Sequence, residues 1–172
     1  MSKQLLVTEA THAASDFGAA NDVVDEAAAA AFGVNRTDLR IIGLVAASGA
    51  LTAGRLATEA NLSPAATTTA IQRLTRAGHL TRRTDADDRR RAVVELTPGA
   101  AELLAEIYAP IERAGRAILE EYAPEQLALV IEVLRKGERM QRAEAARIRA
   151  REPLSPPPPG GSAVEGCVES RR

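Results

Sequence analysis

The feature that most constrains the fold is the turn chemistry of residues 51–78, which separates two helical patterns. Thr52 can cap a short helix, and Asn61 follows that helix where the chain must turn, because Asn tolerates the left-handed backbone. Ser63 and Pro64 then combine an N-cap with a proline at the first helical position, which is a strong start signal. The second helix continues to residue 77, just before a glycine. A short helix, a tight turn and a longer helix together predict a helix-turn-helix.

The residues after this second helix alternate with a period of two, which is the pattern of β-strands. Residues 80–83 and 93–96 form the alternating runs, and a turn with three acids and three consecutive arginines separates them. This pattern predicts a hairpin, here called the wing (residues 80–96). Thr97 and Pro98 repeat the cap and proline signal, so a new helix is expected directly after the wing. The predicted fold class is mainly α with a small two- or three-stranded β wing: a winged helix-turn-helix with flanking dimerisation helices.

Long helical patterns flank this unit on both sides. An Ala-rich helix is expected over residues 18–32, and two helices with apolar stripes follow the wing. A small compact unit cannot cover so much apolar surface, so we expect a homodimer. The C-terminal segment is rich in Pro, Gly and Ser, which predicts disorder. The predicted organisation is a flexible N-terminus (1–17), an N-terminal dimerisation helix (18–36), a winged helix-turn-helix DNA-binding domain (37–97), C-terminal dimerisation helices (98–151) and a disordered tail (152–172).

Charge is distributed unevenly along the chain, although the formal net charge is only −1. Residues 51–97 carry eight basic and five acidic side chains, whereas the remainder carries 14 basic and 18 acidic ones. A basic segment on an acidic body predicts a local surface for a polyanion, although ordinary surface arginines would give the same balance. The basic segment contains no aromatic residue. This disfavours RNA or single-stranded DNA as the ligand, because those surfaces stack bases on aromatic rings.

Several other functions lack their sequence signals. The single cysteine, Cys167, excludes a disulfide framework within one chain, and the two histidines are too far apart for a metal-ligand pattern. We find no nucleophile, cofactor loop or metal constellation, so we expect a protein that is not an enzyme, with no catalytic residue, no cofactor and no metal. No segment has the apolar run of a signal peptide or a transmembrane helix, so we expect a cytoplasmic protein without a membrane partner.

Small and hydroxyl-bearing residues open the second helix of the helix-turn-helix, followed by an amide and a guanidinium. Thr can offer a hydroxyl to phosphate or a methyl group to thymine, while Gln suits adenine and Arg suits guanine in the major groove. The N-terminus of a helix also attracts phosphate. The alternative is a solvated helix face. Direct DNA contact is favoured, because three successive threonines on an exposed helix are a cost in helix propensity that function could justify. The residues concerned are Ala65, Ala66, Thr67, Thr68, Thr69, Gln72 and Arg73.

The tip of the wing combines Asp85, Asp87 and Asp88 with three arginines, residues 89–91. A calcium loop starting at Asp85 would need Gly at its sixth position and Glu at its twelfth, but Arg90 and Leu96 stand there. Acid–base catalysis would need carboxylates in a shielded pocket, which a hairpin tip does not provide. The tip is therefore either a solvated turn or a finger that reaches phosphates or a narrow minor groove. In the second case Asp88 would orient one of the arginines.

The wing motif Asp88-x-Arg90-x-x-x-Val94-x-Leu96-Thr97, with LATEANLSPAATTTAIQRLTRAGHLTRR before it, resembles the MarR family of transcriptional regulators. The resemblance covers residues 36–99, and the flanking helices fit the dimerisation region of that family. It implies a winged-helix homodimer that binds an inverted-repeat operator in double-stranded DNA, with the second helix in the major groove and Arg90 in the minor groove. The DNA-binding candidates are Arg55, Ser63, Ala65, Ala66, Thr67, Thr68, Thr69, Gln72, Arg73, Arg83, Arg89, Arg90 and Arg91, with Asp88 as a wing-orienting residue.

The resemblance also implies a small aromatic effector between the dimer helices and the winged region, although no residue of the sequence identifies such a pocket. The leading interpretation is a dimeric, sequence-specific DNA-binding transcriptional regulator, a repressor relieved by a small molecule. The alternative is a winged-helix module for protein–protein interaction, whose DNA binding would be weak and insensitive to salt.

Overall fold

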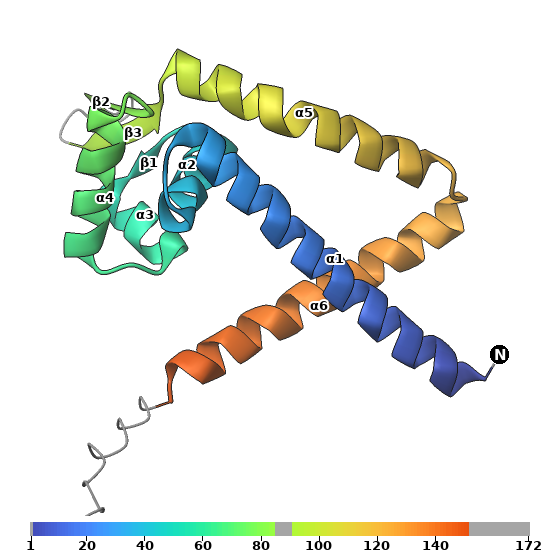
Figure 1. Cartoon of the computed structure of the whole chain (residues 1–172). Coiled ribbons are helices and arrows are strands. Elements are labelled where there is room, and N and C mark those ends of the chain that lie inside the picture. Colours follow the sequence, from blue (N-terminus) through green and yellow to red (C-terminus); the bar gives the residue numbers. More distant parts are fainter. Residues whose placement is uncertain (1, 85–90, 152–172) are drawn as a thin grey trace, which may run out of the picture. The chain divides into compact units, whose positions relative to one another are not determined.

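The computed structural model of the chain describes residues 2–84 and 91–151. It divides into two compact units, Met1–Arg116 and Ala117–Arg172, which are considered separately. The elements in chain order (Figure 1) are α1 (Lys3–Phe32), α2 (Arg36–Ser48), β1 (Leu51–Thr52), α3 (Ala53–Ala60), α4 (Pro64–Arg76), β2 (Leu80–Thr84), β3 (Ala92–Leu96), α5 (Pro98–Glu120) and α6 (Pro124–Arg149). This is the expected mainly α fold with a small sheet.

The helix-turn-helix forms where the turn chemistry predicted it. The Thr52 hydroxyl accepts the Arg55 N–H at 3.3 Å and starts α3. Asn61 ends that helix in the left-handed region, with φ of 56°. The Ser63 hydroxyl accepts the Ala66 N–H at 3.2 Å, and Pro64 begins α4. These local signals were sufficient to predict the helix starts, because each capping side chain accepts a backbone N–H group only three residues later in the chain.

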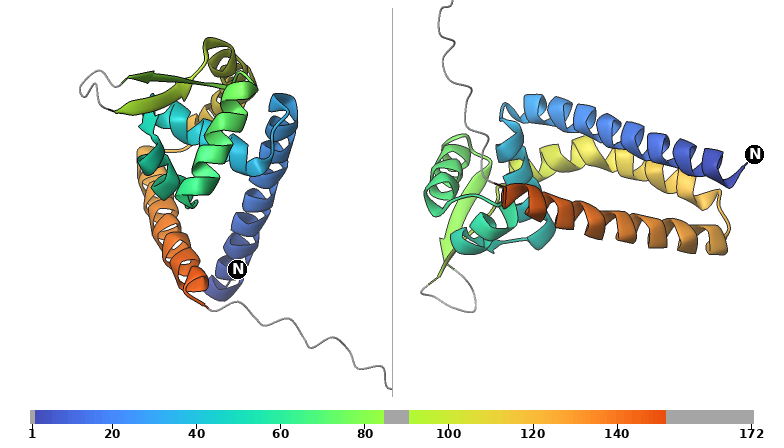
Figure 2. Two further views of the ribbon diagram at one scale, coloured as in Figure 1. Left: turned by 90° about the vertical axis from the view of Figure 1, so that its left-hand side faces the viewer. Right: turned by 90° about the horizontal axis from the view of Figure 1, so that it is seen from below.

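The sheet contains the predicted hairpin of the wing and a third short strand, β1. The strand order is β1-β3-β2, and both pairs are antiparallel, with Leu51 opposite Val94 and Leu80 opposite Leu96. β2 packs against α4, and β3 packs against α2 and α3 (Figure 2). The wing therefore has a fixed root on the helix-turn-helix, while its tip at residues 85–90 lies outside the described residues.

The core of the first unit is aliphatic. Its largest fully buried apolar side chains are Ile41, Ile42, Val45, Leu51, Leu56, Ile71, Leu74 and Leu80. Phe32, at the end of α1, meets His79 edge-on with ring centroids 5.4 Å apart, and the Phe32 carbonyl lies 2.9 Å from His79 Nε2. His79 thus packs against Phe32 and bonds to its backbone, and helps to fix the end of α1 on the root of the wing.

Two boundaries differ from the sequence predictions. The first helix begins at Lys3 and not at residue 18, so the segment predicted to be a flexible N-terminus is helical. The Ser2 side chain accepts the Leu5 N–H and caps this early start, and no proline interrupts the segment. α2 begins at Arg36, one residue before the predicted start of the DNA-binding domain, because the Asn35 side chain accepts the Asp38 N–H at 2.9 Å and caps the helix. The predicted tail, residues 152–172, lies outside the described residues.

The long helices leave much apolar surface uncovered. No residue of α6 is buried. In the described ranges, every exposed large apolar side chain lies on α1, α5 or α6, or is Tyr122 between α5 and α6. They are Leu5, Leu6, Val7, Phe17, Val23, Ile111, Ile118, Leu119, Tyr122, Leu129, Val130, Ile131, Val133, Leu134, Met140 and Ile148. None of the helices described is both long and apolar enough to cross a bilayer.

Candidate DNA interface

The exposed face of α4 is set by the side of the helix that packs into the core. Thr67, Ala70, Ile71 and Leu74 are buried at the spacing of an α-helix. The opposite face exposes Ala65, Ala66, Thr68, Thr69 and Gln72, all of which the sequence placed at the interface. Thr67 differs, because it is only 1% exposed and points into the core. The run of three threonines therefore divides between the core and the solvent.

The threonine hydroxyls of α4 are already engaged. Thr67, Thr68 and Thr69 each donate to the backbone carbonyl four residues earlier, at 3.0, 2.9 and 3.0 Å. This local bond lets a hydroxyl residue sit inside a helix without an unpaired donor. Each of the exposed threonines still has a methyl group and oxygen lone pairs to offer. The Ser63 hydroxyl is different, because it accepts a backbone N–H and keeps its proton for an outside acceptor such as phosphate.

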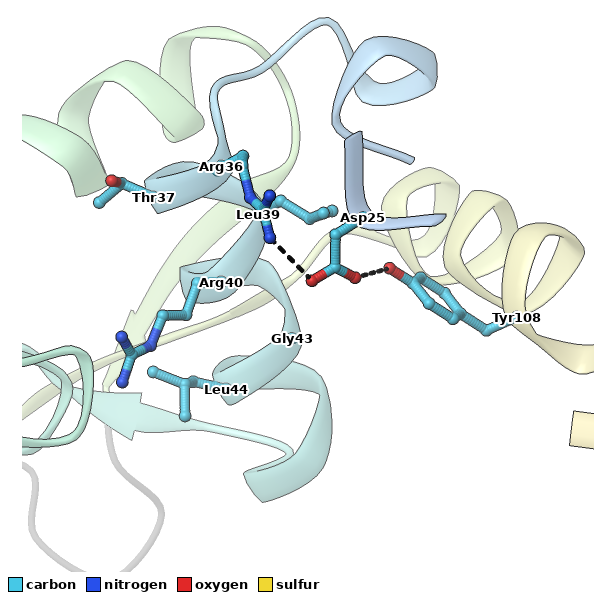
Figure 3. Close-up of a pocket in the computed structure, with 8 residues that line it drawn as sticks. All are labelled: Asp25, Arg36, Thr37, Leu39, Arg40, Gly43, Leu44 and Tyr108. Carbon is cyan, nitrogen blue, oxygen red and sulfur yellow. Dashed lines mark hydrogen bonds and ion pairs between the residues drawn. The ribbon is translucent and has the colours of Figure 1, made fainter. Parts of the chain in front are cut away.

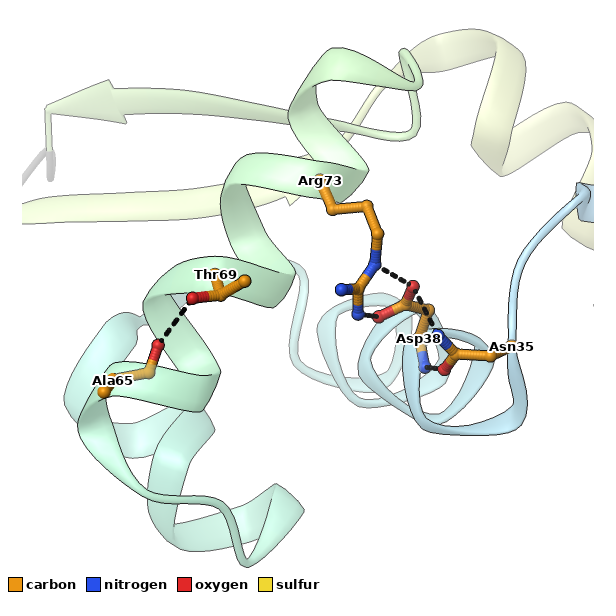
Figure 4. Close-up of polar contacts among 5 residues, drawn as sticks. All are labelled: Asn35, Asp38, Ala65, Thr69 and Arg73. Atoms are coloured by element: carbon orange, nitrogen blue, oxygen red, sulfur yellow. Dashed lines mark hydrogen bonds and ion pairs between the residues drawn. The ribbon is translucent and has the colours of Figure 1, made fainter.

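Arg73 is held by a carboxylate that the sequence pattern did not reveal. Its Nε and one terminal nitrogen donate to the two oxygens of Asp38, each at 2.6 Å (Figure 4). The Asp38 side chain is 2% exposed, whereas that of Arg73 is 46% exposed. Asn35 donates a further bond to the same carboxylate at 3.2 Å. The hydrogen bond from Arg73 to Asp38, helped by their opposite charges, raises the pKa of Arg73 above its usual value.

The other basic candidates lie on α3 and the wing. Arg55 pairs with Glu59 on the same helix at 2.8 Å, and Arg83 of β2 pairs with Glu95 of β3 at 2.5 Å. Arg91 is exposed at the start of β3. The remaining wing candidates, Arg89, Arg90 and Asp88, and the neighbouring Asp85 and Asp87, lie outside the described residues.

Two further arginines belong to this surface but were missed. Arg76 is exposed four residues after Gln72, so it continues the same stripe of α4, and Arg82 is exposed on β2. Within residues 2–84 and 91–151, no ion pair or side-chain hydrogen bond occupies either of them. The helical spacing from Gln72 could have identified Arg76.

A cavity of about 530 Å³ lies between α1, α2 and α5 (Figure 3). Arg36 pairs with Asp22 at 2.6 Å and with Asp25 at 3.7 Å, and the Tyr108 hydroxyl lies 3.4 Å from Asp25. Burial, followed by the negative charge of Asp25, raises the pKa of Tyr108. The hydrogen bond to Asp22 raises the pKa of Arg36. The lining residues are Asp25, Arg36, Thr37, Leu39, Arg40, Gly43, Leu44 and Tyr108.

The sequence identified no residue of this cavity, because its lining comes from three separate helices. The cavity is lined by α2, the helix that also carries Asp38, the partner of Arg73. In the part of the chain that the structure describes, no three metal-ligating side chains come together.

Comparison with known proteins agrees with this architecture. Residues 32–91 match the model of the MarR family. Over 124 residues the chain is 29% identical to the uncharacterized HTH-type transcriptional regulator YcgE of Bacillus subtilis, covering 72% of this chain and 80% of that protein. The structure is similar to that of RV1404 from Mycobacterium tuberculosis, with a TM-score of 0.60 and 19% identity, over 81% of this chain and 94% of the other.

A second solved structure, NadR in complex with 4-hydroxyphenylacetate, has a TM-score of 0.51 and 24% identity, over 79% of this chain and 92% of the other. The two structural similarities show the winged-helix fold. The family match falls on the segment that contains the helix-turn-helix and most of the wing. Residues 32–91 are therefore similar to the MarR family, and the chain as a whole resembles an HTH-type transcriptional regulator.

Proposed function

We propose that the chain acts in the cytoplasm as a homodimeric repressor that binds an inverted-repeat operator in double-stranded DNA. In each copy the first turns of α4 enter the major groove, where the N-terminal residues of a recognition helix contact base edges. The exposed face of α4 carries this proposal. Its small residues allow close approach, Gln72 supplies an amide, and Ser63 supplies a hydroxyl proton at the end of the helix that attracts phosphate.

The uncovered apolar side chains of α1, α5 and α6 support dimerisation. Exposed large apolar side chains in this number are rare on a protein that works as a monomer. A second copy of the same chain is the simplest cover, because two-fold symmetry matches each patch with itself. The same symmetry presents two copies of α4, so the operator should contain two half-sites about one helical turn, or roughly 10 base pairs, apart.

The wing supplies positive charge beside α4. Arg82 and Arg83 are exposed on β2, and Arg91 is exposed directly before β3. The family resemblance assigns the minor-groove contact to Arg90, which lies outside the described residues. Neutralising phosphates with these side chains releases counterions, so operator binding should weaken steeply as salt is added.

The cavity between α1, α2 and α5 is our proposed effector site. Its volume of about 530 Å³ is in the range of small-molecule pockets. The Arg40 guanidinium at this cavity donates to the Glu59 carbonyl at 3.3 Å, and Tyr108 adds a phenol. A small aromatic carboxylate would match these groups, and NadR was solved with a compound of this class. A bound effector that shifted α2 would disturb the bond between Asp38 and Arg73, and therefore the position of α4 on α2.

The proposal can be tested by fluorescence anisotropy with the DNA upstream of the protein's own gene, with Gln72→Ala as the variant. We expect tight binding by the wild type, a symmetric footprint and a loss of about 1–3 kcal/mol of binding free energy in the variant. Gln4→Ala, at an exposed position of α1, is the matched control and should bind normally. Equal binding by the wild type and Gln72→Ala would contradict the role of α4.

The effector site needs a separate measurement. Aromatic acids such as 4-hydroxyphenylacetate should release the wild type from DNA, and Arg40→Ala should bind DNA normally but resist release. Weak DNA binding that does not change with salt would instead favour the protein-interaction module.

A further inference from the structure

The first turns of α4 contain no positively charged side chain that can reach a base. Residues 64–72 have no lysine or arginine, so Arg73 is the first candidate for reading guanine. Guanine is recognised chiefly by an arginine that donates two bonds to its O6 and N7 atoms. In this structure Arg73 already donates two bonds of 2.6 Å to Asp38 (Figure 4).

Asp38 is unable to release Arg73 without a penalty. Its side chain is 2% exposed, and its other neighbour, Asn35, contributes a neutral amide bond at 3.2 Å. Moving Arg73 to a base would leave a buried carboxylate without its counter-charge, which is strongly unfavourable. Arg73 is therefore a positioning residue that seats α4 on α2.

Between residues 64 and 72, the groups that remain on the exposed face of α4 are methyl groups, threonine oxygens and one amide. Ala65 and Ala66 carry only a methyl group. Thr68 and Thr69 have their hydroxyl protons committed to the carbonyls of Pro64 and Ala65, which leaves a methyl group and oxygen lone pairs. Apolar groups of this size contact the C5-methyl group of thymine, while the lone pairs can accept from an amino group.

We infer that α4 reads adenine–thymine pairs in each half-site, through thymine methyl groups and a bidentate contact from Gln72 to adenine, and that it does so because Asp38 withholds Arg73 from guanine. This inference rests on the proposed function, in which α4 enters the major groove. It names the bases at that site: the positions facing the first two turns of α4 are A·T, and any guanine in the operator is read elsewhere.

The test starts with the full chain and a library of random duplexes, from which bound sequences are selected. The selected half-site is then remade with deoxyuridine in place of thymidine, which removes only the C5-methyl group. The wild type should lose about fourfold in affinity for each methyl contact that is removed. Thr69→Ser, which removes the protein methyl group and keeps the hydroxyl, should lose a similar factor on the thymine site.

At the position that Thr69 contacts, the losses of binding free energy from the uracil replacement and from Thr69→Ser should not add, because both changes remove the same contact. The matched control is Thr11→Ser on α1, an exposed threonine with the same bond to the carbonyl four residues earlier, at 2.9 Å. It should respond to uracil as the wild type does. If the wild type kept its full affinity when uracil replaced thymine at every position facing α4, the inference would be overturned.

Asp38→Asn tests the second half of the inference. With the carboxylate neutralised, Arg73 can leave α2, and guanine at a position facing α4 should become at least about fivefold more favourable relative to adenine. A folded variant with an unchanged base preference would contradict the role of Asp38. If this variant does not fold, the uracil and Thr69→Ser measurements still decide whether α4 reads thymine.

The failures of the two proposals are distinguishable. A chain that binds no duplex at low salt refutes the proposed function, and this inference with it. Symmetric binding to half-sites with guanine opposite the first turns of α4 leaves the proposed function intact and overturns this inference alone.

Discussion

Replacing Asp38 by asparagine should cost far more stability than the same change at Asp22, although both carboxylates lie 2.6 Å from an arginine nitrogen. The difference is burial, because the Asp38 side chain is 2% exposed and that of Asp22 is 68% exposed. Hydrogen bonds to a buried charged group contribute about 1.5–3 kcal/mol. Arg73 is half-exposed and can regain water once it is released, so the full penalty of a broken, fully buried pair does not apply.

We therefore expect Asp38→Asn to lower the free energy of unfolding by about 2 kcal/mol. For a chain of this size that corresponds to a fall in Tm of about 4–8 °C. Asp22→Asn should leave both quantities nearly unchanged, because exposed ion pairs contribute little and are screened by salt. Urea and thermal unfolding, followed by circular dichroism at one protein concentration, give the comparison. Equal losses in the two variants would refute the argument from burial.

Three further outcomes are expected. Asn61→Ala should lower the free energy of unfolding by about 1 kcal/mol, because φ is 56° at this position, whereas Asn61→Gly should be tolerated; urea unfolding that ranks the two variants the other way would contradict the turn geometry. In a Tyr122→Phe background, absorbance titration should give a midpoint for Tyr108 above about 10, and Asp25→Asn should lower the pKa of Tyr108 only in part, since burial is the larger cause. Because the pKa of Tyr108 is higher in the folded chain than in the unfolded chain, neutral Tyr108 stabilises the fold fully below the pKa of the unfolded chain. This stabilisation is lost as the pH rises through the pKa of the folded chain. Arg90→Ala should weaken operator binding and reduce the slope of log affinity against log salt by about 1, and an unchanged slope would exclude a phosphate contact.

The parts of the fold that the sequence predicted depend on local chemistry. Ser63 and Asn61 act within a few residues of the positions they cap, and the same holds for Thr97, whose hydroxyl accepts the Ala100 N–H at 3.2 Å. The strands of the wing follow from alternation alone. Gly78, where φ is 79°, ends the helix-turn-helix as its sequence position predicted. Signals of this kind need no knowledge of distant contacts.

The parts that the sequence did not predict depend on which distant residues meet. Asp38 and Arg73 are separated by 35 positions, so nothing in either local pattern indicates their bond. Thr67 was placed on the interface with its neighbours, because a run of similar residues conceals which one faces the core. The cavity required Asp25 and Tyr108, 83 positions apart, to face each other.

The most direct test of the account is the stoichiometry and symmetry of the complex between the full chain and its operator. Analytical ultracentrifugation of the protein with a labelled duplex, combined with hydroxyl-radical footprinting, measures both. We predict two chains on each duplex and protection in two symmetric patches about one helical turn apart. A single chain on the duplex, an asymmetric footprint, or no complex at low ionic strength would contradict a homodimer that reads DNA with paired copies of α4.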